Sequence, residues 1–278
     1  MGLMVLSVGL LTAMDGTGKY LVQDYPLGQV VWARYAFNLL ALLPLALLGR
    51  RPVWQTRAAG WQWIRALCMI LATWTMFLSL KWLPMAETYA IAFLSPLLVA
   101  LLAGPVLGER VGWARWLAAF FGFLGVVVVL RPGSGMFGAV ALAPLAMALS
   151  FALYQLATRA LGGRDHATTT MFYSAAVGTL FTTPVLWWQW REPDPFGWLL
   201  MLAMGVLGLL AQLAMIQAFA LGPASLISPF LYSQIVWASL FGYLVFGDLP
   251  DLMTLVGAAV VVASGLWLWR VEAKGKSG

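Results

Sequence analysis

Charged residues are scarce in this sequence. Asp, Glu, Lys and Arg make up only 9% of its 278 residues, against about 25% in a typical soluble globular domain. Hydrophobic residues reach 62%, and the mean hydropathy is +0.88. This composition excludes a water-soluble monomer and a disordered chain. It indicates a protein that crosses a membrane several times.

Reactive side chains are scarce too. The chain has one cysteine, Cys68, and one histidine, His166, so an internal disulfide and a thiolate metal cluster are excluded. His166 lies in a short polar stretch and is expected to be solvated. No H-E-x-x-H, P-loop or G-x-S-x-G motif is present, so a metalloprotease, an ATPase or a lipase has no support. We therefore expect no catalytic residue, no metal and no cofactor.

Basic residues exceed acidic ones, 16 to 10, but they are spread among apolar runs. Because they form no continuous basic face, nucleic acid is not an expected partner. The expected partners are the lipid bilayer and a small-molecule substrate. The first twenty residues are apolar but lack a basic start and an A-x-A cleavage site. They therefore predict a retained first membrane span and not a signal peptide.

Apolar runs long enough to span a bilayer recur along the chain. A membrane helix needs about 20 mostly apolar residues, and stretches with charge, proline or glycine separate the runs. Only short loops remain between them, so there is no room for a soluble catalytic domain. The sequence predicts an all-α integral membrane protein with ten transmembrane helices, at about 2–22, 27–48, 63–82, 84–107, 113–130, 136–160, 168–190, 196–220, 223–246 and 251–270.

The distribution of Lys and Arg predicts an orientation. With both termini in the cytoplasm, eleven basic residues fall on the inner side, namely Arg50, Arg51, Arg57, Arg65, Arg110, Arg115, Arg159, Arg164, Arg270, Lys274 and Lys276. Four fall on the outer side, namely Lys19, Lys81, Arg131 and Arg191. Cytoplasmic loops of membrane proteins carry an excess of Lys and Arg. The bias therefore favours cytoplasmic termini.

The two halves of the chain share a weak internal repeat. A shift of 139 residues places Pro84 on Pro223, Ala86 on Ser225, Gly108 on Gly247, Glu109 on Asp248 and Arg131 on Arg270. We therefore divide the chain into residues 1–134 and residues 135–278, the second part ending in a short cytoplasmic tail. Because each half has five spans, the second must enter the membrane upside down, as in alternating-access transporters. The alternative is chance similarity among apolar helices.

Two stretches carry a resemblance to a known family. They comprise Leu80–Ala86, Phe93–Pro96 and Leu107–Arg110, and then Leu221–Ser225, Ser228–Tyr232 and Phe246–Pro250. With Arg34 on the second segment, they resemble the drug/metabolite transporter superfamily in its EamA-type branch. That branch typically has Glu where this chain has Asp248, which keeps the charge. The resemblance spans the whole chain and implies a multi-pass secondary transporter of the bacterial inner membrane, not an enzyme.

The cargo is less well indicated than the family. The chain's size and aromatic content resemble those of YddG-type exporters, which implies export of neutral and aromatic amino acids. The alternative is export of other small metabolites or toxic compounds, such as riboflavin- or nucleoside-like molecules or drugs. Coupling is open between facilitated diffusion and proton exchange. The expected assembly is a monomer, with a homodimer as the alternative.

Four charged residues fall within the predicted membrane spans. Placing an ionisable group in a membrane costs free energy, so each of these residues is a candidate for a functional role. They are Asp15, Lys19, Arg34 and Glu87. Asp15 and Lys19 are four residues apart on one helix face, so they could pair, either as a substrate or proton site or as a structural ion pair. Arg34 could bind a carboxylate or brace a neighbouring helix. Glu87 could cap its helix or bind a substrate amine.

Uncharged polar and aromatic side chains within the spans are candidates for the substrate site, because an apolar cavity with a few polar groups suits an aromatic or aliphatic amino acid. The alternative is that they hydrogen-bond neighbouring helices. The candidates are Trp74, Tyr89, Tyr154, Gln155, Gln212, Gln217, Tyr232 and Gln234.

Two prolines and a set of small residues predict how helices bend and pack. Pro96 and Pro229 fall within equivalent spans of the two halves, where a proline removes a backbone hydrogen bond and permits a hinge. The alternative is that proline is simply common in membrane helices. Small residues at close-packing spacing predict a helix seam formed by Ala118, Gly122, Gly125, Ala259, Ala263 and Gly265.

Overall fold

A computed structural model describes residues 2–48, 53–108, 112–131, 139–162, 164–221 and 228–275. Within these residues the chain is nearly all helical, as the sequence predicts. The elements are α1 (Gly2–Asp24), α2 (Leu27–Leu48), α3 (Ala59–Trp82), α4 (Met85–Ala92), α5 (Ser95–Leu107), α6 (Trp113–Leu130), α7 (Ala139–Leu161), α8 (Ala167–Thr182), η1 (Thr183–Val185), α9 (Leu186–Gln189), α10 (Pro195–Ala220), η2 (Ser228–Ser233), α12 (Gln234–Phe246) and α13 (Leu252–Gly275).

Each of the ten expected segments contains helix. Among the described residues, five helical stretches are both long and apolar enough to cross a membrane, and they are Ala59–Trp82, Met85–Leu107, Trp113–Leu130, Pro195–Ala218 and Leu252–Val271. These five stretches agree with a protein that passes through a membrane several times.

Three spans that the sequence predicts as continuous are broken. The span at 84–107 divides at Phe93 and Leu94 into α4 and α5, because Pro96 cannot donate a backbone hydrogen bond and its ring crowds the carbonyl of Ala92. The span at 168–190 becomes α8, η1 and α9, with Pro184 inside η1. The described part of the span at 223–246 is η2, which contains Pro229, followed by α12.

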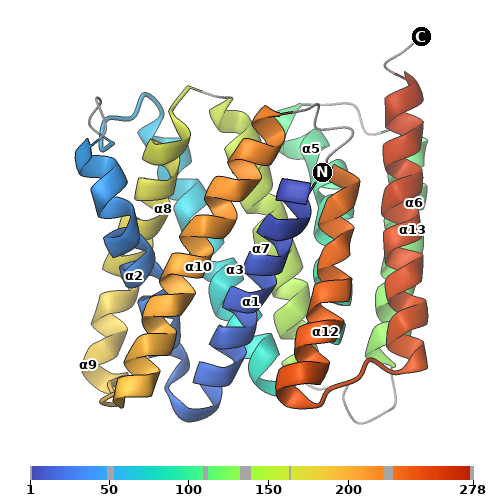
Figure 1. Ribbon diagram of the computed structural model, residues 1–278. Helices are drawn as coiled ribbons and strands as arrows, with labels where there is room; N and C mark the ends of the chain where they lie inside the picture. The colour runs from blue at the N-terminus through green and yellow to red at the C-terminus, as the bar shows by residue number, and fades with distance from the viewer. Residues whose placement is uncertain are drawn as a thin grey trace.

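The helices pack in pairs. α3 packs along α7, α1 along α10 and α6 along α13 (Figure 1), and α2 contacts both α8 and α10. At the α6–α13 contact, a Cβ on Gly125 would lie 2.8 Å from the carbonyl oxygen of Gly257. Only glycine allows two helix backbones to approach so closely. The α6 side of the predicted seam is confirmed, because Gly122 and Gly125 face Ser264 and Gly257. Its α13 side is wrong: Ala259 and Ala263 are exposed, and Gly265 faces Tyr232.

The bundle has two distinct ends. We call the end at which α1 begins and α13 finishes the terminal end (Figure 1). The opposite end holds the α1–α2, α3–α4 and α12–α13 turns. A core of fully buried side chains lies between these ends and includes Met14, Phe77, Met85, Met201 and Met204.

Candidate functional site

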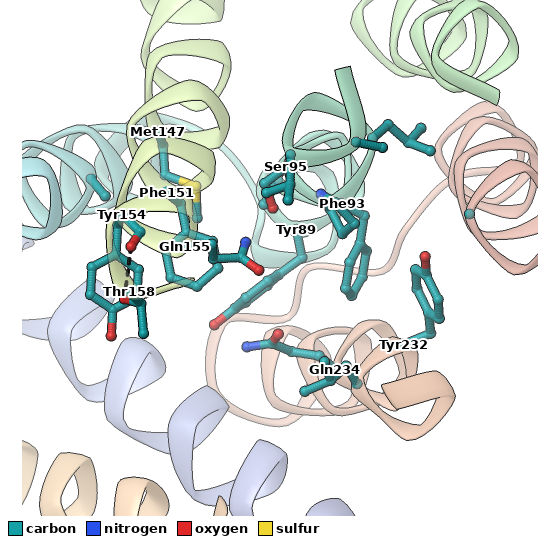
Figure 2. A pocket seen from close by; sticks show the side chains of 18 of the residues that line it. Tyr89, Phe93, Ser95, Met147, Phe151, Tyr154, Gln155, Thr158, Tyr232 and Gln234 are labelled. Carbon is teal, nitrogen blue, oxygen red and sulfur yellow. Dashed lines mark hydrogen bonds between the residues drawn. The ribbon is translucent and has the colours of Figure 1, made fainter. Parts of the chain in front are cut away.

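A cavity of about 650 Å³ lies at the centre of the bundle. Side chains from both halves of the chain line it (Figure 2). It extends from Asp15, in the middle of α1, to Arg115 in the first turn of α6 and to Trp269 near the end of α13. Thr158 and Arg159 also line it, and both residues are exposed. The cavity therefore reaches the protein surface at the terminal end.

Many of the predicted site residues meet in this cavity. Those that line it are Asp15, Arg34, Tyr89, Pro96, Tyr154, Gln155, Tyr232 and Gln234. They come from α1, α2, α4, α5, α7, η2 and α12, so the fold gathers residues that are far apart in sequence. Trp74, Gln212, Gln217, Lys19 and Glu87 are not part of the lining. The side chain of Pro229 lies outside the described residues.

Helix periodicity explains why Trp74 is excluded. The cavity face of α3 presents Met69, Ala72, Thr73 and Met76, which have the spacing of a single helix face. Trp74 points elsewhere, and its ring lies 3.2 Å from the position that a Cβ on Gly28 of α2 would occupy. On α10, Met215 reaches the cavity in place of the two predicted glutamines, of which Gln212 is half-buried and Gln217 exposed.

Aromatic rings form two sides of the cavity (Figure 2). On one side Phe93 and Tyr232 are in contact, with ring centroids 5.2 Å apart. On the other side Phe151 and Tyr154 stack nearly parallel, with centroids 5.5 Å apart and an interplanar angle of 16°. A glutamine amide lies beside the rings on each side, from Gln155 on α7 and Gln234 on α12. Such a site can hold a flat ring and hydrogen-bond to its polar edge.

A buried charge cluster lies at the end of the cavity that is farthest from the terminal end of the bundle. The hydroxyl of Tyr89 donates a hydrogen bond to the Asp15 carboxylate. Arg34 Nη1 lies 3.6 Å from Asp15 Oδ1, and the guanidinium is 5.7 Å from the centre of the Phe77 ring. Asp15 therefore pairs with Arg34 of α2, and the possible pairing with Lys19 does not occur.

Lys19 instead binds the second half of the chain. Its Nζ lies 2.7 Å from Asp248 Oδ2, 3.2 Å from the carbonyl oxygen of Leu83 and 4.7 Å from the centre of the Phe246 ring. The Lys19 residue is only 6% exposed, so it does not extend to the lipid headgroups. Its long side chain reaches the α12–α13 turn, which is distant in sequence and could not be paired with it from helix spacing.

A second ion pair lies at the opposite end of the bundle, as the Lys19–Asp248 pair does. Arg131, just after α6, pairs with Asp251, just before α13. The Arg131 guanidinium and the backbone amide of Thr254 lower the pKa of Asp251 to about 2. Both ion pairs at the opposite end therefore join residues of the first half to residues of the second.

Arg65 is the main site residue that sequence reasoning missed. It lies on α3, is 5% exposed, and was counted only among the inner basic residues. Its Nη2 donates to the Tyr154 hydroxyl at 2.6 Å, and its Nε donates to Thr158 Oγ1 at 2.9 Å. The signal available in the sequence was an arginine at the edge of an apolar segment, which could equally lie at a membrane surface.

The family of the chain follows from comparison with known proteins. The model of the EamA-like transporter family matches residues 2–131 and residues 136–270. The chain belongs to the EamA-like transporter family. This EamA-like protein is a multi-pass membrane transporter and not an enzyme, as the sequence predicts.

Several curated proteins resemble this EamA-like transporter over nearly their whole length. A riboflavin transporter of Vibrio cholerae is 30% identical, over 98% of this chain and 93% of the relative. An S-adenosylmethionine uptake transporter of Rickettsia felis is 27% identical, over 99% of this chain and 94% of the relative. The pseudopaline exporter CntI of Pseudomonas aeruginosa is 27% identical, over 97% of this chain and 95% of the relative. The cargoes in these names differ, so family membership fixes transport of a small molecule and not which one.

A solved crystal structure has the same fold. It superposes with a TM-score of 0.65 at 20% identity and covers 95% of this chain and 94% of that chain. The likeness therefore extends over the whole helical bundle.

Proposed function

We propose that this transporter carries small molecules with a planar heteroaromatic ring, of the riboflavin- or nucleoside-like class, by alternating access. The observation that carries this proposal is the cavity with aromatic rings on two sides and a glutamine amide on each. Its volume, about 650 Å³, lies in the range of about 300–1,000 Å³ that holds drug-sized ligands. A single amino acid would leave much of this space unfilled.

The names of the relatives support the same class. Riboflavin and S-adenosylmethionine, which name two of the similar transporters, both contain a heteroaromatic ring system. Stacking on aromatic side chains tolerates different rings, because every such ring presents a π-face. Amide side chains add selectivity, since a glutamine can both donate to and accept from the edge of a heterocycle.

Export of neutral and aromatic amino acids across the bacterial inner membrane is the second candidate. It is favoured by one observation, which is that Asp15 and Arg34 both line the cavity near aromatic rings. A carboxylate and a guanidinium could bind the ammonium and carboxylate groups of an amino acid. The two charges already neutralise each other, however, so an amino acid would have to separate them.

Alternating access requires two halves that can exchange roles, and the packing supports this arrangement. A shift of 139 residues carries α1 onto α7 and α3 onto α10, so it exchanges the α1–α10 contact with the α3–α7 contact. The same shift carries Phe93 onto Tyr232, and these two rings touch in the cavity. We therefore propose that residues 1–134 and 135–278 are two inverted five-helix repeats around a shared site.

The orientation that the basic residues favour assigns a state to this conformation. With both termini in the cytoplasm, the terminal end faces inward and the cavity is open to the cytoplasm. The Lys19–Asp248 and Arg131–Asp251 ion pairs then close the outer end between the two halves. Each chain holds a complete cavity, so a monomer suffices for transport.

Uptake into liposomes containing the purified protein tests the proposed cargo. Riboflavin, adenosine, tryptophan and phenylalanine are offered separately, with and without a pH gradient. Saturable uptake of riboflavin or adenosine is the expected result. Uptake of the amino acids alone would replace the proposal with the second candidate, and uptake of none of the four would overturn both.

A further inference from the structure

Arg65 is a buried cation whose hydrogen-bond acceptors are all neutral. They are the Tyr154 and Thr158 hydroxyls, the Ser174 hydroxyl at 2.5 Å and the carbonyl oxygen of Thr170 at 3.1 Å. Among the residues that the structure describes, no carboxylate forms an ion pair with Arg65. A buried charge without a counter-charge is costly. A bound anion nearby would offset that cost.

The hydrogen bonds around Arg65 leave one donor uncommitted on a residue that lines the cavity. The Thr158 hydroxyl donates to the carbonyl oxygen of Tyr154 at 2.8 Å, and the Ser174 hydroxyl donates to that of Thr170 at 3.0 Å. The Tyr154 hydroxyl accepts from Arg65, and within the described part of the chain its own hydrogen has no acceptor. Tyr154 lines the cavity. Arg65 polarises this hydroxyl and makes it a stronger donor.

The same region of the cavity carries positive charge. Arg115 from α6 and Arg159 from α7 line the cavity together with Tyr154 and Thr158. Asp15 is the one acidic residue among the described lining residues, and it is held by Arg34 and Tyr89. Arg115 and Arg159 each interact with other groups of the protein as well, so Arg65 is the cation whose charge is left to be offset by a ligand.

We infer that Tyr154, supported by Arg65, binds a negatively charged oxygen group of the cargo, either a carboxylate or a phosphate. The inference rests on the proposed function, because the two aromatic sides would hold the ring while Tyr154 binds the anionic end. It narrows the heteroaromatic cargo to molecules that also carry an anionic group, such as a nucleotide or a flavin phosphate. In this arrangement Tyr154 contacts the cargo, and Arg65 is a positioning residue that acts through it.

Equilibrium binding to the full-length protein in nanodiscs of zwitterionic lipid tests the inference. Two pairs of probes differ mainly in one anionic group: riboflavin 5′-phosphate with riboflavin, and phenylalanine with phenylalaninamide. We expect the anionic member of at least one pair to bind about 10- to 100-fold more tightly, the usual value of a hydrogen bond to a charged group. The phosphate pair and the carboxylate pair separate the two possible sources of the charge.

Tyr154→Phe removes the hydroxyl and keeps the ring. It should weaken binding of the anionic probe about ten-fold or more and change binding of its neutral partner by less than about three-fold. Tyr173→Phe is the matched control, because the Tyr173 hydroxyl bonds to the carbonyl oxygen of Trp54 and does not line the cavity. It should leave all four affinities unchanged. A thermal unfolding curve for each variant verifies that it is folded.

Four outcomes would count against parts of the account in different ways. Equal binding of charged and neutral probes by the wild type overturns the anionic site but leaves the proposed function intact. Equal weakening of both probes by Tyr154→Phe also overturns it, because it shows a structural role for the hydroxyl. Binding of phenylalanine but of neither flavin supports the anionic site and overturns the heteroaromatic cargo. Binding of no probe overturns both.

Discussion

The cations at the two ends of the bundle have different kinds of partner. At the opposite end, Lys19 and Arg131 are each paired with a carboxylate from the other half of the chain. Towards the terminal end, Arg65 is bound only by neutral groups, and the cavity reaches the surface. One end satisfies its charges within the protein and holds the halves together. At the terminal end, Arg65 has no carboxylate partner among the described residues and lies behind the lining of an open cavity, where we propose that a cargo anion offsets its charge.

This difference suggests how the cycle proceeds. Opening the opposite end requires separation of the two ion pairs that join the halves. In the proposed cycle, closing the terminal end requires the cavity to narrow around the cargo. The comparison therefore predicts that variants in the cavity impair transport itself, whereas variants at the opposite end change which conformation is populated.

The largest effect should follow from disruption of the cluster of Asp15, Arg34 and Tyr89, which lies between the two ends of the bundle. Asp15→Ala leaves Arg34 buried without a partner, which costs about 3–5 kcal/mol in the free energy of unfolding. We expect uptake to fall by roughly 100-fold and thermal stability to fall with it. Asp15→Asn separates the two contributions, because it removes the charge that pairs with Arg34 while its amide oxygen can still accept the hydrogen bond from Tyr89. Normal uptake by the alanine variant would contradict a central role for the cluster.

The next largest effect should come from the aromatic side of the cavity. Tyr232→Ala removes a ring that contacts Phe93, and loss of one stacking ring weakens binding of a heteroaromatic ligand by roughly ten-fold. Tyr232→Phe should bind normally, because it keeps the ring. The affinity of the transported cargo measures both. If Tyr232→Phe were as weak as the alanine variant, the hydroxyl and not the ring would be the binding group.

A smaller effect is expected from the Lys19–Asp248 ion pair, which we expect to hold the opposite end closed. Lys19→Met keeps the apolar stem and removes the bond to Asp248. We expect a two- to five-fold faster reaction of a cavity cysteine with a membrane-impermeant thiol reagent added at the opposite end. The cysteine would replace Ala92, which lines the cavity, in a Cys68→Ser background. Unchanged or slower labelling would show that this ion pair does not hold the end closed.

The smallest effect should be the pH dependence of the Arg131–Asp251 pair. Because the pKa of Asp251 is lowered from 3.8 to about 2, the pair adds stability above pH 4 that is lost as the pH falls through 2. The pair is partly exposed, so the contribution is modest. Melting temperatures of wild type and Asp251→Asn should differ slightly at neutral pH and converge near pH 2. A difference that persists at pH 2 would point to another cause.

The sequence predicted the helical segments well because apolar length is a strong signal. It predicted possible bends at Pro96 and Pro229 but not the interruption within 168–190. A proline can kink a membrane helix or end it, and neighbouring helices decide which.

The candidate site was predicted in part, and the failures have a physical cause. On a helix that is apolar all round, periodicity cannot tell which face borders a cavity, so Trp74 was included and Phe151 was missed. Helix spacing offered Lys19 as a partner for Asp15, whereas the actual partners of both residues come from other helices. Arg65 resembled an interfacial arginine until the fold placed it behind Tyr154.

The most direct test of the account is a side-by-side uptake measurement in liposomes. Wild type, Tyr232→Ala and Trp74→Ala are compared for riboflavin uptake over a range of concentrations. The account predicts saturable uptake by the wild type and by Trp74→Ala, and a half-saturation concentration raised roughly ten-fold in Tyr232→Ala. Uptake that is absent in the wild type, or equally affected by both substitutions, would contradict it.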